Sequence, residues 1–324
     1  MTPNNPPYKV GLDLGGSKIE IIVLSPSGQS LFRQRIPTPQ AQDYLDLSQQ
    51  YQAILTSIEQ LLATASRQLN INFHHIGIGI PGAISPATGL VKNANTVCLI
   101  GRPFQQDLAT KLNCKVSLGN DADCFVLSEA MDGAGQEASS VFGVIIGTGC
   151  GGGIVINQQL LNGPNAICGE WGHNPLPWAE VDEEYLPCYC GKKGCIETFL
   201  SGPGFTQQAN SFSEEFLAKN PGHQQKIAAH TATDWHELLL LKDPLAVKVF
   251  NRYAYQLAKA LASIINVLDP EVIVLGGGMS NIDYLYQRVP EILPEYVFSD
   301  QVLTRLVKAK HGDSSGVRGA AFLT

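Results

Sequence analysis

The sequence predicts an α/β protein with two domains, and three observations support this prediction. The chain has 324 residues, enough for two domains of ordinary size. A strand, a glycine-rich turn and a second strand occupy residues 9–24, and the same plan returns in residues 140–156. Strand patterns alternate elsewhere with patterns of helical period. The repeated unit predicts an internal duplication, with one glycine turn in each half.

In the first half, short apolar runs alternate with helical spacing, and glycine and proline mark the breaks between them. A hairpin with its tip at residues 26–28 extends the first pair of strands. The expected strands are residues 9–14, 19–24, 31–36, 76–80 and 116–118, and the expected helices are residues 48–69, 103–112 and 122–131.

In the second half, the strongest signal is a long helix over residues 244–268, where apolar residues recur every three or four positions. Residues 201–233 are expected to be irregular or helical. The expected strands are residues 140–146, 154–156, 271–275 and 303–309, and a helix of small residues closes the chain at 314–321.

The bulk composition excludes several functions. The net charge of −7 and the absence of a Lys/Arg-rich run disfavour a nucleic-acid partner. We expect no signal peptide and no membrane span, because no apolar run reaches 18 residues. Eight cysteines are present, of which three belong to the motif described next. The other five are scattered, which is typical of reduced thiols in the cytoplasm.

The most distinctive stretch runs over residues 169–197 and contains three thiols and one imidazole. His173, Cys188, Cys190 and Cys195 make up a Cys₃His set, which suits a tetrahedral Zn²⁺. Free thiols in a loop are the alternative. A closed four-ligand site leaves no position for a catalytic water, so the metal would shape a pocket. Glu170 and Glu197 flank the ligands, and the metal would hold these carboxylates in place.

Three glycine turns follow predicted strands. Asp13 precedes the first, Gly15-Gly16-Ser17-Lys18, whose backbone N–H groups could face a phosphate. The spacing is not that of a P-loop, and a simple tight turn is the alternative. The second turn is Gly147-Thr148-Gly149, and the third, at residues 276–278, could pass beneath a nucleobase or ribose.

Two polar groups have open interpretations. Asp121 lies where a strand meets a helix, so it is either an N-cap carboxylate or a general base at the carboxyl end of a strand. The polar segment at residues 93–96 is either an Asx-turn loop or a ligand contact.

Nearly the whole chain resembles the ROK family of repressors and sugar kinases, within the actin, Hsp70 and hexokinase superfamily, and most closely its manno(fructo)kinase branch. The motifs that carry the resemblance are residues 13–18, 91–95, 169–177, 188–197 and 310–321. The resemblance implies two ribonuclease-H-like domains with an interdomain active-site cleft. Residues 1–121 would form a small N-terminal domain joined by the C-terminal helix 312–324, and residues 122–311 a large domain with the zinc loop. Ser17 in place of the common Thr and Cys98 in place of an aromatic are the departures.

The resemblance also implies an ATP-dependent sugar 6-phosphotransferase that uses ATP, Mg²⁺ and Zn²⁺. It assigns Asp121 as the base and implies a cytoplasmic homodimer. Asp13 and residues 15–18 would face Mg²⁺ and the ATP phosphates, with Thr148 in the second phosphate turn. The further residues it implies are Gly147, Gly149, Gly276 and Gly277 for the nucleotide, Asn95, Asn120, Asp121, Glu170, His173 and Glu197 for the sugar, and His173, Cys188, Cys190 and Cys195 for zinc.

The expected reaction is the phosphorylation of D-fructose to fructose 6-phosphate. Mannose, glucose and an N-acetylhexosamine are the alternative substrates, because the same hydroxyl-binding residues would serve them all. The loops at residues 95–101 and 173–185 would choose among these sugars. A sugar-responsive repressor of the same family is disfavoured, because only 12 residues precede Asp13 and the charge is acidic.

Overall fold

The computed structural model describes residues 8–180, 186–220, 222 and 230–324, and the chain folds into two compact units. Unit 1 contains residues 1–137, 153–168 and 311–324, and unit 2 contains residues 138–152 and 169–310. No helix of the described residues is long and apolar enough to cross a membrane.

The first sheet has the order β3-β2-β1-β4-β7. Its first three strands are antiparallel neighbours, whereas β4 runs parallel to β1 and β7 runs parallel to β4. The first glycine turn therefore joins the antiparallel strands β1 and β2. The carboxyl ends of the parallel strands β1, β4 and β7 lie at one edge of the sheet. The strands are β1 (Lys9–Leu14), β2 (Lys18–Leu24), β3 (Ser30–Pro37), β4 (His75–Ile80) and β7 (Lys115–Asn120).

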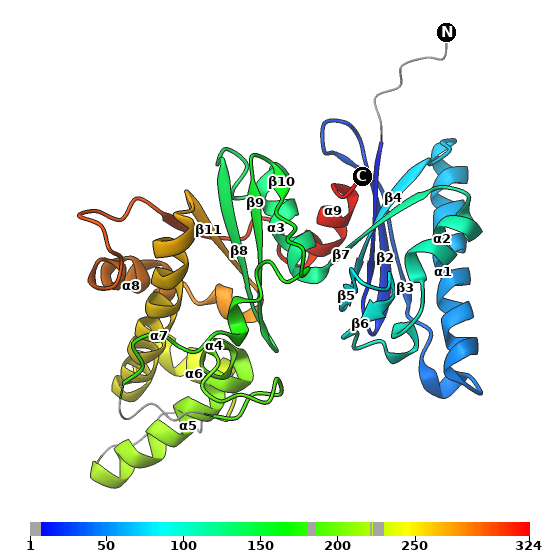
Figure 1. Cartoon of the computed structure of the whole chain (residues 1–324). Coiled ribbons are helices and arrows are strands. Elements are labelled where there is room, and N and C mark those ends of the chain that lie inside the picture. Colours follow the sequence, from blue (N-terminus) through cyan, green and yellow to red (C-terminus); the bar gives the residue numbers. More distant parts are fainter. Residues whose placement is uncertain (1–7, 181–185, 221, 223–229) are drawn as a thin grey trace. The chain divides into compact units, whose positions relative to one another are not determined.

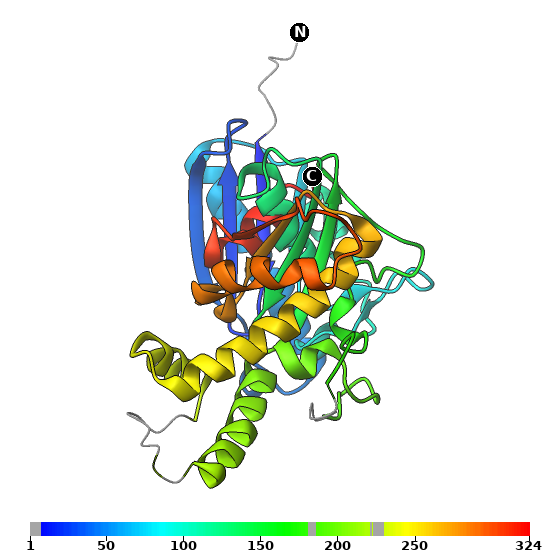
Figure 2. The ribbon, with the colours of Figure 1, turned by 90° about the vertical axis from the view of Figure 1, so that its left-hand side faces the viewer.

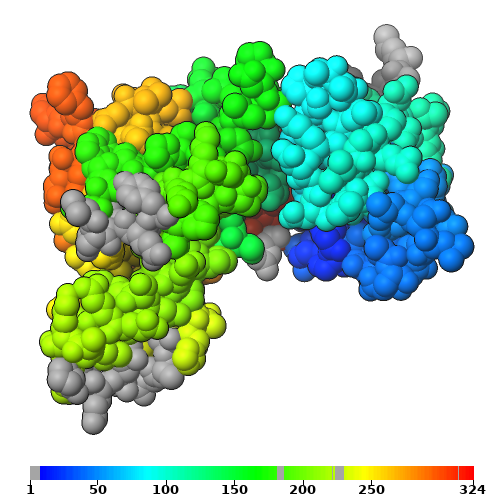
Figure 3. Space-filling model, turned by 60° about the horizontal axis from the view of Figure 1, so that its bottom comes forward, coloured from blue at the N-terminus to red at the C-terminus, as the bar shows by residue number. Residues whose placement is uncertain are grey.

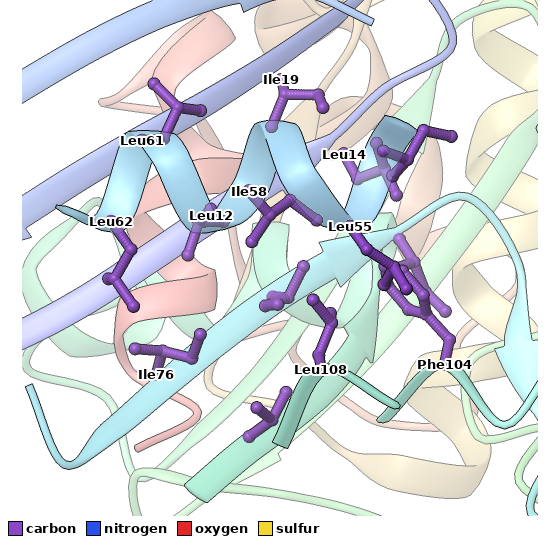
Figure 4. Packing of buried hydrophobic residues seen from close by; sticks show 14 of the residues in the cluster. Leu12, Leu14, Ile19, Leu55, Ile58, Leu61, Leu62, Ile76, Phe104 and Leu108 are labelled. Carbon is purple, nitrogen blue, oxygen red and sulfur yellow. The ribbon is translucent and has the colours of Figure 1, made fainter. Parts of the chain in front are cut away.

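Helices α1 (Leu47–Leu69) and α2 (Phe104–Leu112) cover one face of the first sheet, and α9 (Ser315–Ala321) lies on the other (Figure 1). Successive side chains of each strand point to opposite faces of the sheet. Leu12 and Leu14 pack with α1 and α2, while Ile22 and Leu24 pack with α9. Figure 4 shows the first of these cores. Each large apolar side chain buried there stabilises the fold by about 1.5–3 kcal/mol.

The second sheet, β10-β9-β8-β11-β12, repeats the order of the first. Strands β9 and β10 are antiparallel, β11 is parallel to β8, and β12 is parallel to β11. The division between the units runs through β9. The common order agrees with the predicted duplication. The strands are β8 (Ser140–Ile146), β9 (Cys150–Ile156), β10 (Gln159–Leu160), β11 (Val272–Gly276) and β12 (Arg305–Lys308).

Unit 2 is built around the long helix α7 (Pro244–Leu268), which begins at the N-cap Asp243 and has Pro244 in its first turn. Helix α8 (Tyr284–Ile292) lies beside α7 (Figure 2), and α5 (Gly202–Lys219) forms an outlying lobe of the unit, yellow-green in Figure 3. Helices α4 (Ile196–Leu200) and α6 (Ala232–Leu240) also pack against α7.

The structure differs from the predicted elements in a few places. Residues 202–219 form one continuous helix, where the sequence left the choice between irregular and helical open. Helix α8 was not predicted, because its internal Pro290 is a strong breaker signal. Strand β9 begins at Cys150, four residues before the predicted start, because the glycines of residues 151–153 are part of the strand.

Candidate active site

The carboxyl edge of the first sheet brings the predicted acidic residues together. Asp13 on β1 is in register with Gly79 on β4, and Ile80 at the end of β4 is in register with Asn120 on β7. Asp13, Asn120 and Asp121 therefore lie at the edge where open α/β sheets bind their ligands. A Cβ at Gly79 or at Gly316 would lie 3.5 or 3.6 Å from the Asp13 carboxylate, so these glycines leave space beside it.

The charge on Asp13 is poorly stabilised by the protein alone. Burial, together with the nearby carboxylates of Glu20 and Asp121, raises the pKa of Asp13 to about 6, although the positive charges of Lys18 and Arg35 oppose the shift. Glu20 is itself buried and bonded to Arg33 and Arg35. A divalent cation beside Asp13 would relieve this repulsion, and Mg²⁺ prefers carboxylate ligands. The residues present therefore fit a magnesium ion.

Asp121 is the first residue of α3 (Asp121–Asp132), and the cap of this helix is its neighbour. The Asn120 side chain accepts a hydrogen bond from the Asp123 N–H at 2.6 Å, so Asn120 is the N-cap. The N-cap alternative for Asp121 is therefore wrong. Asp121 is exposed at the surface as a residue, and its Oδ1 accepts from the Ala122 N–H at 2.9 Å. Partial desolvation of its carboxyl group by the surrounding atoms raises the pKa of Asp121 in spite of this hydrogen bond, a shift that suits a general base.

The first glycine turn is held by donors from the segment that follows β3. Thr38 Oγ1 donates to the Gly15 carbonyl at 2.8 Å, Gln40 Nε2 donates to the Gly16 carbonyl at 2.9 Å, and the Thr38 N–H donates to the Ser17 carbonyl at 3.0 Å. With these carbonyls occupied, the exposed turn can offer the backbone N–H groups of Gly16 and Ser17 to an anion.

The second and third glycine turns adjoin each other in unit 2. Strand β11 runs beside β8, with Gly276 in register with Ile145. Gly277 has a φ of +80°, and a Cβ on it would lie 2.4 Å from the Ile146 carbonyl oxygen, so this position accepts only glycine. The residues predicted to border adenosine therefore lie next to the turn at residues 147–149.

A cavity of about 170 Å³ opens beside Asn120 within unit 1. Its lining combines apolar side chains, among them Ile80, Ala83 and Leu118, with the polar groups of Asn120 and Asp123. The cavity is also lined by Ile84, Gly119, Asn162, Gly163, Ala166 and Cys168.

The polar segment at residues 93–96 is anchored at Ala94, which is buried against Gly82, while Asn95 is exposed. Both interpretations of this segment stay open.

The four predicted metal ligands converge in unit 2. The donor atoms of His173, Cys188, Cys190 and Cys195 all lie within 4.8 Å of one another. Cys190 Sγ is 3.6 Å from Cys195 Sγ, and Cys188 Sγ is 3.5 Å from His173 Nδ1. A tetrahedron with Zn–S bonds of about 2.3 Å has edges of about 3.8 Å, so the cluster fits Zn²⁺.

Ionisation of the Cys195 thiol is unfavourable without a nearby cation. Burial raises the pKa of Cys195 to about 12, and its hydrogen-bonded neighbours Cys190 and Cys188 raise it as well. A bound zinc ion would stabilise the thiolates. These four residues would hold the ion, and the closed ligand set assigns it a structural role.

Tyr189 is a neighbour of the cluster that sequence reasoning missed. Its hydroxyl lies 2.9 Å from His173 Nε2, and the two rings meet edge to face. His173 therefore turns Nδ1 toward the thiols and Nε2 toward Tyr189, where the sequence suggested a sugar hydroxyl. The one feature of the sequence that could have indicated this contact is the position of Tyr189 between the candidate ligands Cys188 and Cys190.

The two predicted sugar carboxylates of unit 2 have different surroundings. Glu170 is exposed and precedes the short 3₁₀ helix η3 (Trp171–His173). Glu197 is half-buried, and its Oε2 accepts a hydrogen bond from the Cys150 N–H at 2.9 Å, which leaves Oε1 for another donor. Part of the loop expected to select the sugar, residues 181–185, lies outside the described residues.

Solved structures show the same architecture. A ROK hexokinase from Thermus thermophilus superposes with a TM-score of 0.80 at 26% identity, covering 98% of this chain and 97% of its own. A ROK family glucokinase from Streptomyces griseus, in complex with glucose and AMPPNP, superposes with a TM-score of 0.71 at 25% identity, covering 98% and 99%. Two sheets of like order define the actin-like two-domain fold of these structures.

The chain belongs to the ROK family, whose model matches residues 9–324. An N-acetyl-D-glucosamine kinase from Yersinia pseudotuberculosis is 37% identical over 318 residues, which is 97% of each chain. The N-acetyl-D-glucosamine kinase of Vibrio cholerae is also 37% identical over 318 residues, covering 97% of this chain and 98% of its own.

Proposed function

We propose that this protein transfers the γ-phosphoryl group of ATP to the 6-hydroxyl of N-acetyl-D-glucosamine. Membership of the ROK family, with kinases as relatives over almost the entire chain, supports the kinase reaction. The relatives at 37% identity are N-acetyl-D-glucosamine kinases, which favours the N-acetylhexosamine alternative over the predicted D-fructose. The predicted homodimer stays a prediction.

The observation that carries the mechanism is the exposed Asp121 at the head of α3. Because Asn120 caps the helix, one oxygen of Asp121 remains free to accept a proton from a sugar hydroxyl. General-base assistance of this kind contributes about 10²- to 10⁴-fold in rate. Asp13 would hold the Mg²⁺ ion, which supplies charge neutralisation at the phosphates. The two glycine turns would add backbone donors.

The cavity beside Asn120 supports the choice of an N-acetyl sugar. An acetamido group has an apolar methyl and an amide, and it needs a pocket with an apolar wall and a polar group at its rim. Ile80, Ala83 and Leu118 supply such a wall, and the side-chain NH₂ of Asn120 is available because its oxygen is bonded to the helix. Fructose, mannose and glucose have no group that would use this wall.

Steady-state kinetics with a panel of sugars tests the proposal. ADP release is measured with N-acetylglucosamine, N-acetylmannosamine, glucose, mannose and fructose. We expect kcat/KM for N-acetylglucosamine to exceed that for fructose by about tenfold or more, since discrimination by one buried group amounts to about 1–3 kcal/mol. A preference for fructose would restore the first prediction, and no ADP release with any sugar would contradict the kinase.

The variant Ala83→Leu tests the cavity itself. The larger side chain fills the apolar wall, so kcat/KM for N-acetylglucosamine should fall by about tenfold while that for glucose changes little. An equal fall for both sugars would show that the cavity does not hold the acetamido group.

A further inference from the structure

Both segments that carry the metal ligands contact the second glycine turn or the start of β9, the strand that follows it. The first of these segments is η3, which ends at His173. Trp171 Nε1 donates a hydrogen bond to the Gly151 carbonyl at 3.0 Å. Gly172 lies so close to β9 that a Cβ on it would come within 2.1 Å of the Cys150 carbonyl oxygen. The segment therefore packs directly on the start of β9, where the turn ends.

The second segment begins at Cys195 and continues into α4. Two residues after that ligand, Glu197 Oε2 accepts a hydrogen bond from the Cys150 N–H at 2.9 Å. A Cβ on Gly149 would lie 2.7 Å from the same oxygen, so the carboxylate sits against the turn itself. At the first residue of α5, two residues after α4 ends, the Gly202 N–H donates to the Gly147 carbonyl at 2.8 Å. Both ends of the turn are thus held from this side.

The metal cluster joins these two segments. His173 ends the first, and Cys195 begins the second, with both donor atoms in the cluster. A backbone hydrogen bond from the Ile196 N–H to the Asn174 carbonyl, at 2.8 Å, connects the same segments. An ion bound by His173 and Cys195 would fix the distance between the two supports of the turn. The turn therefore has its position set by residues that the ion orders.

We infer that Glu197 is a positioning residue for the nucleotide, and that the metal cluster fixes the ATP-phosphate turn at residues 147–149 in addition to the sugar-binding loop. This inference rests on the proposed function, because it takes that turn as a phosphate site. In this arrangement Glu197 orients the turn through the Cys150 N–H with one oxygen and keeps Oε1 for the sugar. Loss of the metal would weaken ATP binding even when no sugar is present.

The test measures the binding of Mg²⁺ and a non-hydrolysable ATP analogue to the zinc-loaded protein by calorimetry, without sugar. Glu197→Ala should raise the Kd about tenfold or more, because it removes a hydrogen bond to a charged group and leaves the Cys150 N–H without this acceptor. Glu197→Gln keeps an acceptor oxygen at the same reach and should stay within about threefold of wild type. Glu214→Ala, a change of an exposed glutamate on α5, is the matched control and should bind normally.

Two further measurements guard against a folding defect. Glu197→Asp keeps the charge but is too short to reach the Cys150 N–H, so it should bind the analogue as weakly as the alanine variant. Zinc is then removed from wild type with a chelator, and circular dichroism confirms that the protein remains folded. We expect the Kd for the analogue to rise about tenfold and to return when zinc is added back.

The outcomes separate this inference from the proposed function. If wild type does not bind the analogue at all, the proposed kinase fails. If wild type binds it and Glu197→Ala binds it equally well, only the inference fails. Zinc removal that weakens sugar binding and leaves nucleotide binding unchanged would also overturn the inference.

Discussion

The two glycine turns occupy equivalent places in sheets of the same order, yet their supports differ. The turn at residues 15–18 is held by Thr38 and Gln40, which lie at the end of the same three-stranded meander. The turn at residues 147–149 is held by Glu197 and Gly202, about 50 residues further along the chain. The two hairpins occupy like places in their sheets, and one is supported by nearby residues while the other is supported by distant ones.

This difference indicates how each of the two turns can lose its structure. The first turn depends on contacts that form with its own sheet, so metal loss should leave it intact. The second depends on the loop with the metal cluster, so in our inference loss of the metal would weaken nucleotide binding. The acidic residues Asp13 and Asp121 both belong to unit 1, so the proton transfer and the magnesium ion are assigned to the half with local support.

The largest expected effect is on chemistry in unit 1. Asp121→Asn removes the proton acceptor and keeps the size of the side chain, so kcat should fall by about 10²- to 10⁴-fold. The Kd values for sugar and for the ATP analogue should change by less than about threefold. Stopped-time ADP assays and calorimetry provide these values. A variant with kcat near that of wild type would remove Asp121 from the role of base.

The next effect concerns Asp13 and pH. The native pKa of about 6 lies above the unfolded value of about 3.9, so the native state binds more protons between these pH values. Asp13 therefore costs no stability below about pH 4, and its destabilising effect grows between about pH 4 and pH 6 and is complete above about pH 6. Asp13→Asn should raise the free energy of unfolding above pH 7 by up to about 3 kcal/mol, without magnesium or nucleotide.

Urea unfolding at a series of pH values measures this gain. Asp46→Asn is the control, because Asp46 is an exposed N-cap whose substitution keeps an acceptor for the Gln49 N–H. A gain for Asp13→Asn that is the same at pH 4 and at pH 7 would contradict the assignment of the cost to the charge.

The smallest effects compare the turns directly. A Cβ at Gly149 would meet Glu197 at 2.7 Å, whereas a Cβ at Gly16 meets nothing within 4 Å. Gly149→Ala should lower the free energy of unfolding by about 1–3 kcal/mol, and Gly16→Ala by less than about 0.5 kcal/mol. Thermal unfolding of both variants measures the difference. Equal losses would show that the two turns are supported alike.

Much of the fold could be predicted because its signals are local. The period of apolar residues gives α7 with its observed bounds, Pro244–Leu268, and the apolar run of β8 gives Ser140–Ile146. The cluster of candidate metal ligands could be predicted for the same reason, since three of its four residues lie within eight positions. Helix α8 could not be predicted, because a proline inside a helix, here Pro290, normally indicates that the helix ends.

The parts of the candidate site that depend on contacts between distant residues could not be predicted from the sequence. Nothing in the pattern around Asp121 tells which of two adjacent polar residues caps α3, because Asn and Asp are equally good caps. The bond between Glu197 and the Cys150 N–H joins residues that only the folded unit 2 brings together. The same holds for the contact between Tyr189 and His173 Nε2, because either side chain could have faced solvent.

Helix α9 has a consequence for how the protein is made. Gly11 on β1 and Gly77 on β4 admit its backbone so closely that a Cβ on either would come within about 2.2 Å of a carbonyl oxygen of the helix. Arg318 adds hydrogen bonds to Asp132 and to the Gly28 carbonyl. The ribosome makes this helix some 300 residues after β1, so the part of the first sheet at Gly11 and Gly77 stays uncovered until α9 has been synthesised. Until then the apolar surface beneath α9 is exposed in the nascent chain and prone to aggregation.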